Sequence, residues 1–417
     1  MTRAGWAALA AVAAGAFLGS WVVLGHLWYH STPELVDTPG YEQYGDAMAA
    51  GHVPYRDFRL EYPPGALLPF VAPELTARPG DYGSYTHAFE RWMAGAGVLL
   101  ILFTVAAVRA LNATPLRAIG ALALVAASPL LLGTVVLTRF DLWPAALTVA
   151  ALAALLAGRE ELGAIALGAA IATKLYPAVL VPVGIIWVWR LHDRERVLRW
   201  LALVTATCTA VFLPFAAIAP GGLGHSFSVQ LHRPLQIESL GASVLIALHH
   251  VAGLGISVRS DHGSQNIEST GAGAASIVTT LAAVAVLCAI WLAFARGPVQ
   301  RERLVAAAAA SVATFIAFGK VFSPQFMMWL IPLVPLVRSR IAPVLFTAAL
   351  VLTQLWFPAH YWALTTLEPR ESWLLFARNL VVVALVAILG RALLQHEVLG
   401  KARARLEALE RVRAQVE

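Results

Sequence analysis

Long apolar runs separated by short polar stretches dominate the pattern along the chain. A helix that crosses a bilayer needs about 20 apolar residues, because each residue rises 1.5 Å through a hydrocarbon core of about 30 Å. Eight runs predict such helices: Trp6–Trp28, Phe89–Val108, Leu116–Leu137, Leu142–Ala157, Leu201–Ala219, Ala274–Ala295, Ile341–Phe357 and Trp373–Leu394. The first run is too long for a signal peptide and lacks a small-residue cleavage site, so we expect an uncleaved anchor.

Two further runs, Leu162–Trp189 and Leu304–Val337, are too long for one span and too short for two. Each contains a lysine, Lys174 or Lys320, that a proline follows closely. The residue before a proline is disfavoured in a helix, so each run is expected to break there into a hairpin with a polar apex. Irregular backbone at membrane depth is tolerated only where protein or water surrounds it. We therefore expect both apices to line a cavity.

The composition agrees with a membrane protein. Of the 417 residues, 59% are hydrophobic and 13% are charged, and the mean hydropathy is +0.71. Soluble domains contain about 45–50% apolar and about 25% charged residues, so a soluble multidomain enzyme and a disordered chain are excluded. Cys208 and Cys288 lie in apolar runs and indicate neither a disulfide framework nor a metal cluster. The predicted fold class is an all-α polytopic bundle of roughly 10–12 transmembrane helices.

The distribution of charge predicts an orientation. The chain has 30 basic and 24 acidic residues, and most basic residues lie in short loops, which indicates topology and not nucleic-acid binding. With the N-terminus inside, the inner side receives 19 Lys and Arg and 9 Asp and Glu, against 11 and 15 outside. The positive-inside rule then predicts cytoplasmic N- and C-termini and two long external loops, residues 30–88 and 220–273.

The predicted organisation is one transmembrane domain, residues 1–396, with two smaller helical elements. The first is Leu240–Leu254, which is expected to be an interfacial helix in the second external loop. Residues 397–417 predict a basic cytoplasmic helical tail. The tail fits either a partner-binding coiled coil or, as we prefer for so short a piece, a helix lying on anionic lipid.

Polar residues of the external side are the candidates for chemistry. A charged group at membrane depth costs at least about 2.5–3.5 kcal/mol, so each needs a reason. Carboxylates beside cations suit glycosyl transfer from a phosphate leaving group: a base takes the acceptor proton and cations neutralise the phosphate. Phosphate leaves as a stable anion, so one carboxylate suffices, unlike the pair that glycoside hydrolases use. The candidates are Asp37, Tyr41, Tyr44, Asp46, Asp57, Glu61, Tyr62, Arg139, Asp141, Lys174, Tyr176, His232, Arg233, Gln236, Glu238, Lys320 and Gln325.

Five stretches resemble bacterial glycosyltransferase family 87, of the GT-C superfamily. They are VDTPGYEQYGDAMAAGHVPYRDFRLEYPPGALLPF, TRFDLWPAAL, AIATKLYPAVLVP, HRPLQIESL and FGKVFSPQFMMWLIPL, and the similarity spans roughly Trp6 to Leu394. The family includes polyprenol-phosphate-mannose-dependent mannosyltransferases. The resemblance implies a GT-C-type bundle, a lipid-phosphate-linked sugar donor, an outer-face active site and an inverting displacement. It also implies a catalytic aspartate in the first external loop, by position Asp37, with Tyr41 following.

This hypothesis assigns a role to each candidate. Asp37 is the base, and the other acidic, tyrosine and glutamine candidates contact substrate. The donor phosphate is held by Lys174, Lys320 and Arg139, with Arg233 and His232 beside them. The donor would be a polyprenyl-phosphate hexose, and the resemblance favours mannose as the sugar. The acceptor would be a lipid-linked or envelope glycan at the bacterial plasma membrane. No His–carboxylate spacing demands a metal, so no cofactor is expected and a divalent ion has no support.

Other interpretations stay open at this stage. Asp37 also suits a turn or helix N-cap, with Asp46 and Asp57 as alternative bases. Arg139 and Asp141 equally suit a local pair at a helix start. Broken helices with lysines near the midplane also occur in transporters, so a transporter or lipid flippase is the alternative function. A non-catalytic scaffold of a glycan assembly is a third.

Overall fold

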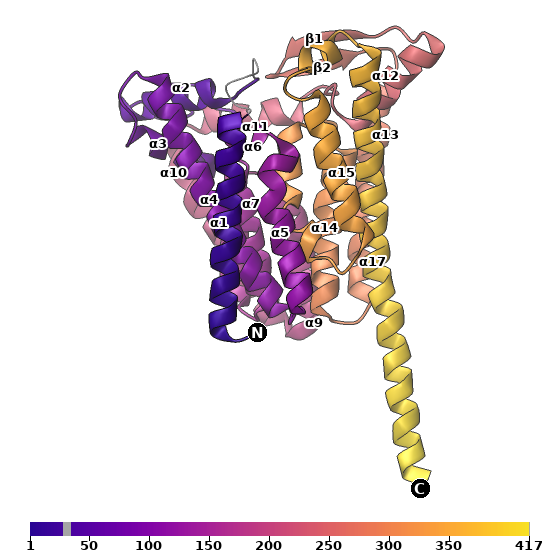
Figure 1. Cartoon of the computed structure of the whole chain (residues 1–417). Coiled ribbons are helices and arrows are strands. Elements are labelled where there is room, and N and C mark those ends of the chain that lie inside the picture. Colours follow the sequence, from indigo (N-terminus) through magenta and orange to yellow (C-terminus); the bar gives the residue numbers. More distant parts are fainter. Residues whose placement is uncertain (28–34, 417) are drawn as a thin grey trace.

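The computed structural model describes residues 1–27 and 35–416, with side chains described through residue 394. Long helices stand side by side, and most of the shorter elements lie at one end of the bundle (Figure 1). The elements before the second long loop are α1 (Arg3–Leu27), α2 (Thr38–Ala49), η1 (Pro64–Ala66), α3 (Leu67–Glu74), α4 (Tyr82–Ala110), α5 (Pro115–Leu132), α6 (Val135–Thr138), α7 (Leu142–Leu156), α8 (Glu160–Thr173), η2 (Tyr176–Leu180), α9 (Val181–Leu191) and α10 (Arg194–Ile218).

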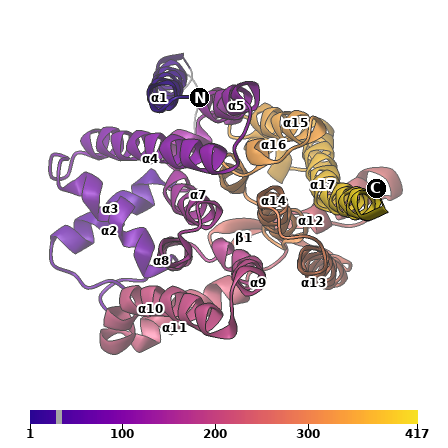
Figure 2. The same cartoon turned by 90° about the horizontal axis from the view of Figure 1, so that it is seen from below.

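The elements of the second half complete the bundle. They are α11 (Pro220–Leu231), α12 (Leu240–Ala252), β1 (Ser257–Asp261), β2 (Ser264–Glu268), α13 (Ala272–Arg296), α14 (Arg301–Phe318), η3 (Pro324–Leu330), η4 (Val334–Leu336), α15 (Ile341–Trp356), α16 (Tyr361–Thr365) and α17 (Pro369–Val416). Seen from below, α14 lies among α7, α9, α13 and α17 (Figure 2). Its alanines, Ala306 to Ala310, are all buried, and such small side chains let neighbouring helices approach closely.

Six of the described helices are long and apolar enough to cross a membrane: α1, α4, α5, α10, α13 and Pro369–Leu394 of α17. Shorter apolar helices include α7, α12 and α15. The prediction of an all-α multi-pass membrane protein is therefore confirmed. The predicted span Leu116–Leu137 is divided, because Gly133 adopts a φ of +80° between α5 and α6.

Both predicted helix breaks are present. In the first run, α8 ends at Thr173 and the chain continues as η2 and α9. Lys174 has an extended backbone conformation between α8 and η2. The second stops at Phe318, but its second limb consists of the 3-10 helices η3 and η4 where an α-helix was expected. Prolines 324, 332 and 335 explain the difference, because each removes a backbone donor from this limb.

The long loops contain more structure than predicted. α2 and α3 lie within the first loop, and β1 and β2 form an antiparallel hairpin in the second, with Ser257 opposite Glu268. Positive φ values at His262 and Gly263 suit its two-residue turn. The expected interfacial helix is α12. The predicted tail continues α17 without interruption to Val416, while Glu417 lies outside the described residues.

Candidate functional site

Asp37 forms an ion pair with Arg139 where the first loop meets the bundle. Arg139 Nε lies 3.0 Å from Asp37 Oδ2, and the Tyr41 hydroxyl donates to the same oxygen at 3.3 Å. Arg139 also donates to the carbonyl of Leu35 and is 7% exposed, against 36% for Asp37. Asp37 occupies the N-cap position of α2, yet its side chain makes no capping hydrogen bond. The carboxylate is therefore oriented by a buried cation and open on one side.

Asp141 pairs with Lys174 and not with Arg139. Lys174 Nζ donates to Asp141 Oδ1 at 2.6 Å, and the indole of Trp329 donates to the same oxygen at 2.7 Å. Asp141 is fully buried, and its Oδ2 has no hydrogen-bond partner in the structure. This contact joins the α6–α7 junction to both helix breaks, because Lys174 belongs to the first and Trp329 to the second.

Aromatic rings surround both ion pairs. Lys174 Nζ lies 4.6 Å from the ring centroid of Phe140 and 5.4 Å from that of Trp329, distances that favour cation–π attraction. The Phe140 ring meets Tyr62 edge-on at 5.2 Å and Tyr41 at 5.8 Å. The two tyrosines thus link the Asp37 and Asp141 pairs into one cluster.

Close backbone packing holds Glu61 and Tyr62 beside this cluster. A Cβ on Gly65 would come within 2.6 Å of the Ala172 carbonyl oxygen, so only glycine fits there. Burial raises the pKa of the Glu61 carboxyl; nearby Arg233 and Lys174 lower that pKa and Asp37 raises it. Charges from the first loop, the first break and the second loop therefore act on one another.

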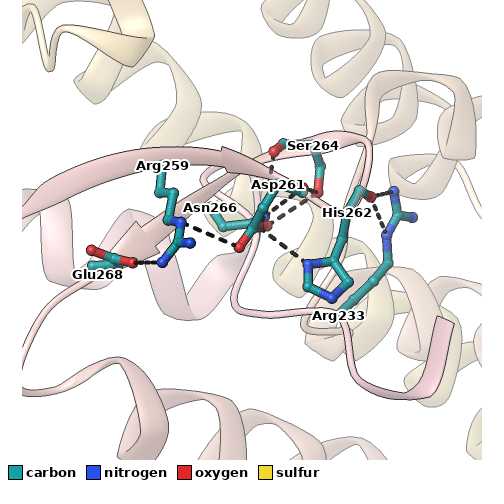
Figure 3. Close-up of polar contacts among 7 residues, drawn as sticks. All are labelled: Arg233, Arg259, Asp261, His262, Ser264, Asn266 and Glu268. Atoms are coloured by element: carbon teal, nitrogen blue, oxygen red, sulfur yellow. Dashed lines mark hydrogen bonds and ion pairs between the residues drawn. The ribbon is translucent and has the colours of Figure 1, made fainter. Parts of the chain in front are cut away.

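The β1–β2 hairpin positions Arg233 (Figure 3). Arg233 donates to the backbone oxygen of His262 through Nη2 at 3.0 Å and Nε at 3.3 Å. The Asn266 amide donates to the backbone and side chain of Asp261 and so ties the two strands together near the turn. Gly263 lies near Glu61 and Arg233, since a Cβ built on it would be 3.5 Å and 3.9 Å from their polar atoms.

Gln236 holds the second break in place. Its side-chain amide donates to Ser323 Oγ and accepts from the Phe322 backbone N–H, both at 2.8 Å. The backbone N–H of Gln236 donates to the Lys320 carbonyl at 3.0 Å. Lys320 Nζ donates to the Leu231 carbonyl at 2.7 Å. Partial burial, and then the positive charge of Arg233, lower the pKa of the Lys320 amine.

Glu238 is a buried carboxyl just before the start of α12. Burial raises its pKa to about 8, against the opposing effects of Arg378, Arg139 and Arg233, and Asp37 raises it further. The Arg378 guanidinium donates to the backbone oxygen of Glu238 at 3.1 Å. The sequence interpretation missed Arg378, although an arginine inside the apolar run Trp373–Leu394 is itself the signal of a functional group at membrane depth.

Three predicted residues from the first loop and α11 make local contacts. Asp57 bonds Arg56 at 2.9 Å and the Val53 N–H at 2.7 Å, which lowers the pKa of its carboxyl to about 2. His232 contacts the Ser228 carbonyl at 2.8 Å. Asp46 is exposed on α2.

The remaining candidates take part in aromatic or partly buried surroundings. Tyr44 stacks on Phe58 at 5.9 Å, and burial raises the pKa of its hydroxyl to about 12. Tyr176 stacks on Trp329 at 4.0 Å and shares a 2.8 Å hydrogen bond with Thr148. Gln325 is partly buried in η3.

A pocket of about 650 Å³ lies between α3, α4 and α7, close to the aromatic cluster. Its walls include Leu68, Trp92, Leu99 and Trp143, with Arg91 also present. Pro69, another lining residue, is adjacent in sequence to Phe70, which stacks on Tyr41 at 4.5 Å. In the described part of the chain, no group of three or more His, Cys, Asp or Glu side chains could hold a metal ion.

Fold and site together define a multi-pass helical membrane protein with coupled acid–base pairs at one end. Residues 60–324 match the profile of glycosyltransferase family 87, which is more than half of the chain, and the chain belongs to this family. Residues 262–392 match a second profile, mannosyltransferase (PIG-M). The predicted family is therefore confirmed.

The chain is also similar to a solved structure. The crystal structure of the Archaeoglobus fulgidus oligosaccharyltransferase, tethered to an acceptor peptide, is 14% identical with a TM-score of 0.47. The match covers 94% of this chain and 55% of that one, so the chain spans about half of its length. The search of curated proteins found no significant match.

Proposed function

We propose that this protein transfers a hexose, expected to be mannose, from a polyprenyl-phosphate donor to a lipid-linked or envelope glycan. The observation that carries the proposal is the Asp37 carboxylate, oriented by Arg139 and Tyr41 beside the Lys174–Asp141 pair. Membership of glycosyltransferase family 87 supports the reaction class. The pocket between α3 and α4 has an apolar lining suited to a prenyl chain.

The chemistry is a single displacement with inversion. Asp37 takes the proton of an acceptor hydroxyl, whose oxygen attacks the anomeric carbon while the bond from that carbon to the phosphate oxygen breaks. The polyprenyl phosphate leaves with the electron pair, and neighbouring cations stabilise its charge. Partial exposure of Asp37 leaves room for the acceptor.

The predicted phosphate-binding cations divide into two groups in this proposal. Arg139 and Lys174 have carboxylate partners at 3.0 and 2.6 Å, and they chiefly orient Asp37 and Asp141. Lys320 and Arg233 donate to backbone carbonyls, so their charges are available to the leaving group. His232, at the end of α11, would contribute at the rim.

The reaction is proposed to occur on the extracytoplasmic face of a bacterial plasma membrane, with both termini cytoplasmic. α2, α3, α12 and the hairpin lie at the end of the bundle opposite the N-terminus (Figure 1), which supports a single chamber on one side. Labelling of Asp46→Cys and Arg194→Cys in intact cells, in a chain without Cys208 and Cys288, tests this. A membrane-impermeant maleimide should react at position 46 and not at 194; the reverse pattern contradicts the orientation.

Transfer itself can be tested with purified protein in nanodiscs. Labelled polyprenyl-phosphate mannose and an envelope lipid extract should give a labelled glycolipid, and Asp37→Asn should reduce the rate by about 10²–10⁴-fold. Asp81→Asn is the matched control, because Asp81 caps the start of α4, where asparagine caps equally well, so the rate should be unchanged. Unaltered transfer by Asp37→Asn would remove the base assignment. Movement of a labelled lipid without a new glycosidic bond would favour the flippase alternative.

A further inference from the structure

Arg378 is a fully buried arginine with free hydrogen-bond donors. It lies on α17 within a membrane-spanning segment, and its side chain is 0% exposed. Nη2 donates to the Glu238 carbonyl, and the guanidinium carbon lies 3.7 Å from the centroid of the Phe322 ring. Nε and Nη1 are buried and have no hydrogen-bond partner in the structure.

This arrangement is costly unless another group completes it. Buried polar groups are almost always hydrogen-bonded, and a buried charge without a counterion is strongly destabilising. Among the described residues no carboxylate lies within 4.0 Å of Arg378. Two neighbouring buried atoms, Trp356 Nε1 and Asn379 Oδ1, also lack partners, and the Trp356 ring centroid is 5.5 Å from the guanidinium carbon.

The neighbouring charges leave Arg378 uncompensated. Arg139 and Lys174 each have a carboxylate within 3.0 Å, whereas Arg378 meets only a backbone oxygen of Glu238. The carboxyl of Glu238 has a pKa of about 8 because of its burial, so at neutral pH it is mostly protonated. A protonated carboxyl does not neutralise the guanidinium and can itself donate to an anion.

We propose that the unpartnered N–H groups on Nε and Nη1 of Arg378 bind the phosphate of the lipid-linked donor. The inference rests on the proposed function and adds a residue that it does not use. A guanidinium N–H donates a strong, charge-assisted hydrogen bond to a phosphate oxygen, and the positive charge stabilises the same group as it leaves. The site belongs to the chamber, because Glu238 is influenced by Asp37 and Arg139 as well as by Arg378.

The test measures how strongly a phosphate group increases lipid affinity. Binding of decaprenyl phosphate and of the uncharged alcohol decaprenol is compared in nanodiscs for wild type, Arg378→Gln, Arg378→Lys and Arg370→Gln. Arg370 is the matched control, an exposed arginine on the same helix that pairs with Glu371 at 3.7 Å. We expect wild type to bind the phosphate about tenfold or more tightly than the alcohol, because hydrogen bonds to charged groups are stronger than those to neutral ones.

Arg378→Gln should lose most of this preference, Arg378→Lys should keep part of it, and Arg370→Gln should keep all of it. An unchanged preference in Arg378→Gln overturns the inference. Inorganic phosphate and phosphatidylglycerol serve as competitors: displacement of decaprenyl phosphate by either one at equal concentration would show a general anion site and overturn the donor assignment. If wild type binds decaprenyl phosphate through Arg378 yet transfers no sugar, the proposed function fails and this binding site stands.

A second measurement does not depend on the variants folding. A density map of the wild-type protein with bound decaprenyl phosphate should place the phosphorus within hydrogen-bonding reach of Arg378. A phosphorus beside Lys174, with Arg378 still covered by Phe322, would contradict the inference.

Discussion

The two helix breaks look alike in sequence, but they hold their charges in different ways. At the first break, the Lys174 side chain is partly buried beside aromatic rings and bonds the buried carboxylate of Asp141. At the second, Lys320 is partly exposed and bonds a backbone carbonyl, while the nearby buried carboxyl is Glu238 with a pKa of about 8. One carboxyl is thus neutralised by a cation and the other by a proton.

This difference shows that a lysine at a helix break is not by itself a phosphate ligand. The energy of a buried cation depends on whether a counterion is already present, because the desolvation cost must be offset by some partner. Lys174 has its partner, whereas Lys320 and Arg378 have only backbone oxygens. Capacity to bind an anion therefore lies on the side of the second break.

The largest expected effect is the loss of Lys174. Lys174→Met leaves Asp141 buried without its counterion, which should lower the free energy of unfolding by about 3–5 kcal/mol. Thermal unfolding in detergent measures this. The double variant Lys174→Met with Asp141→Asn removes both charges and should recover much of the loss. A single variant as stable as wild type would show that the pair does not stabilise the fold.

A smaller effect is expected from Glu238, and it depends on pH. The folded-state pKa of about 8 exceeds the ordinary value of 4.5, so this carboxyl stabilises the fold below pH 4.5 and that contribution declines as the pH rises through 8. The wild-type Tm should fall by a few °C between pH 6 and 8, and Glu238→Gln should flatten that slope. Glu368→Gln serves as the control; equal slopes in wild type and Glu238→Gln would contradict the prediction.

The smallest effect on stability is expected from Lys320. Lys320→Gln loses one hydrogen bond to a carbonyl, a change of about 0.5–1.5 kcal/mol. Because its charge has no carboxylate partner and is available to the leaving phosphate, the same variant should lower kcat for the lipid donor several-fold, with a smaller rise in KM. Steady-state kinetics at varied donor concentration separate the two. A larger loss of stability than in Lys174→Met would reverse the comparison.

The sequence predicted the helices and both breaks well, because apolar length and prolines act locally. It named residues that the structure brings into contact, such as Asp37, Arg139 and Lys174, but it did not select their partners. Arg139 was left open between a phosphate ligand and a pair with Asp141, and the structure pairs it with Asp37. Such choices depend on how distant segments pack, which no local pattern contains.

Other features were missed for identifiable reasons. The β1–β2 hairpin is short and polar, so it has no alternating apolar signal, although His262-Gly263 is a turn sequence. α2 has few apolar residues and contains Pro39 and Gly40 in its first turn. Arg378 was hidden by the surrounding apolar run, where a single charge hardly changes the average hydropathy.

The contact of Gly65 with the Ala172 carbonyl has a consequence for variation among relatives of this protein. The two backbones meet without any intervening side chain, so the loop carrying Glu61 cannot slide along α8 to compensate for an insertion or deletion. Changes of length should accumulate elsewhere in the first loop, and the spacing from Glu61 to Gly65 should stay constant wherever the lysine break is kept.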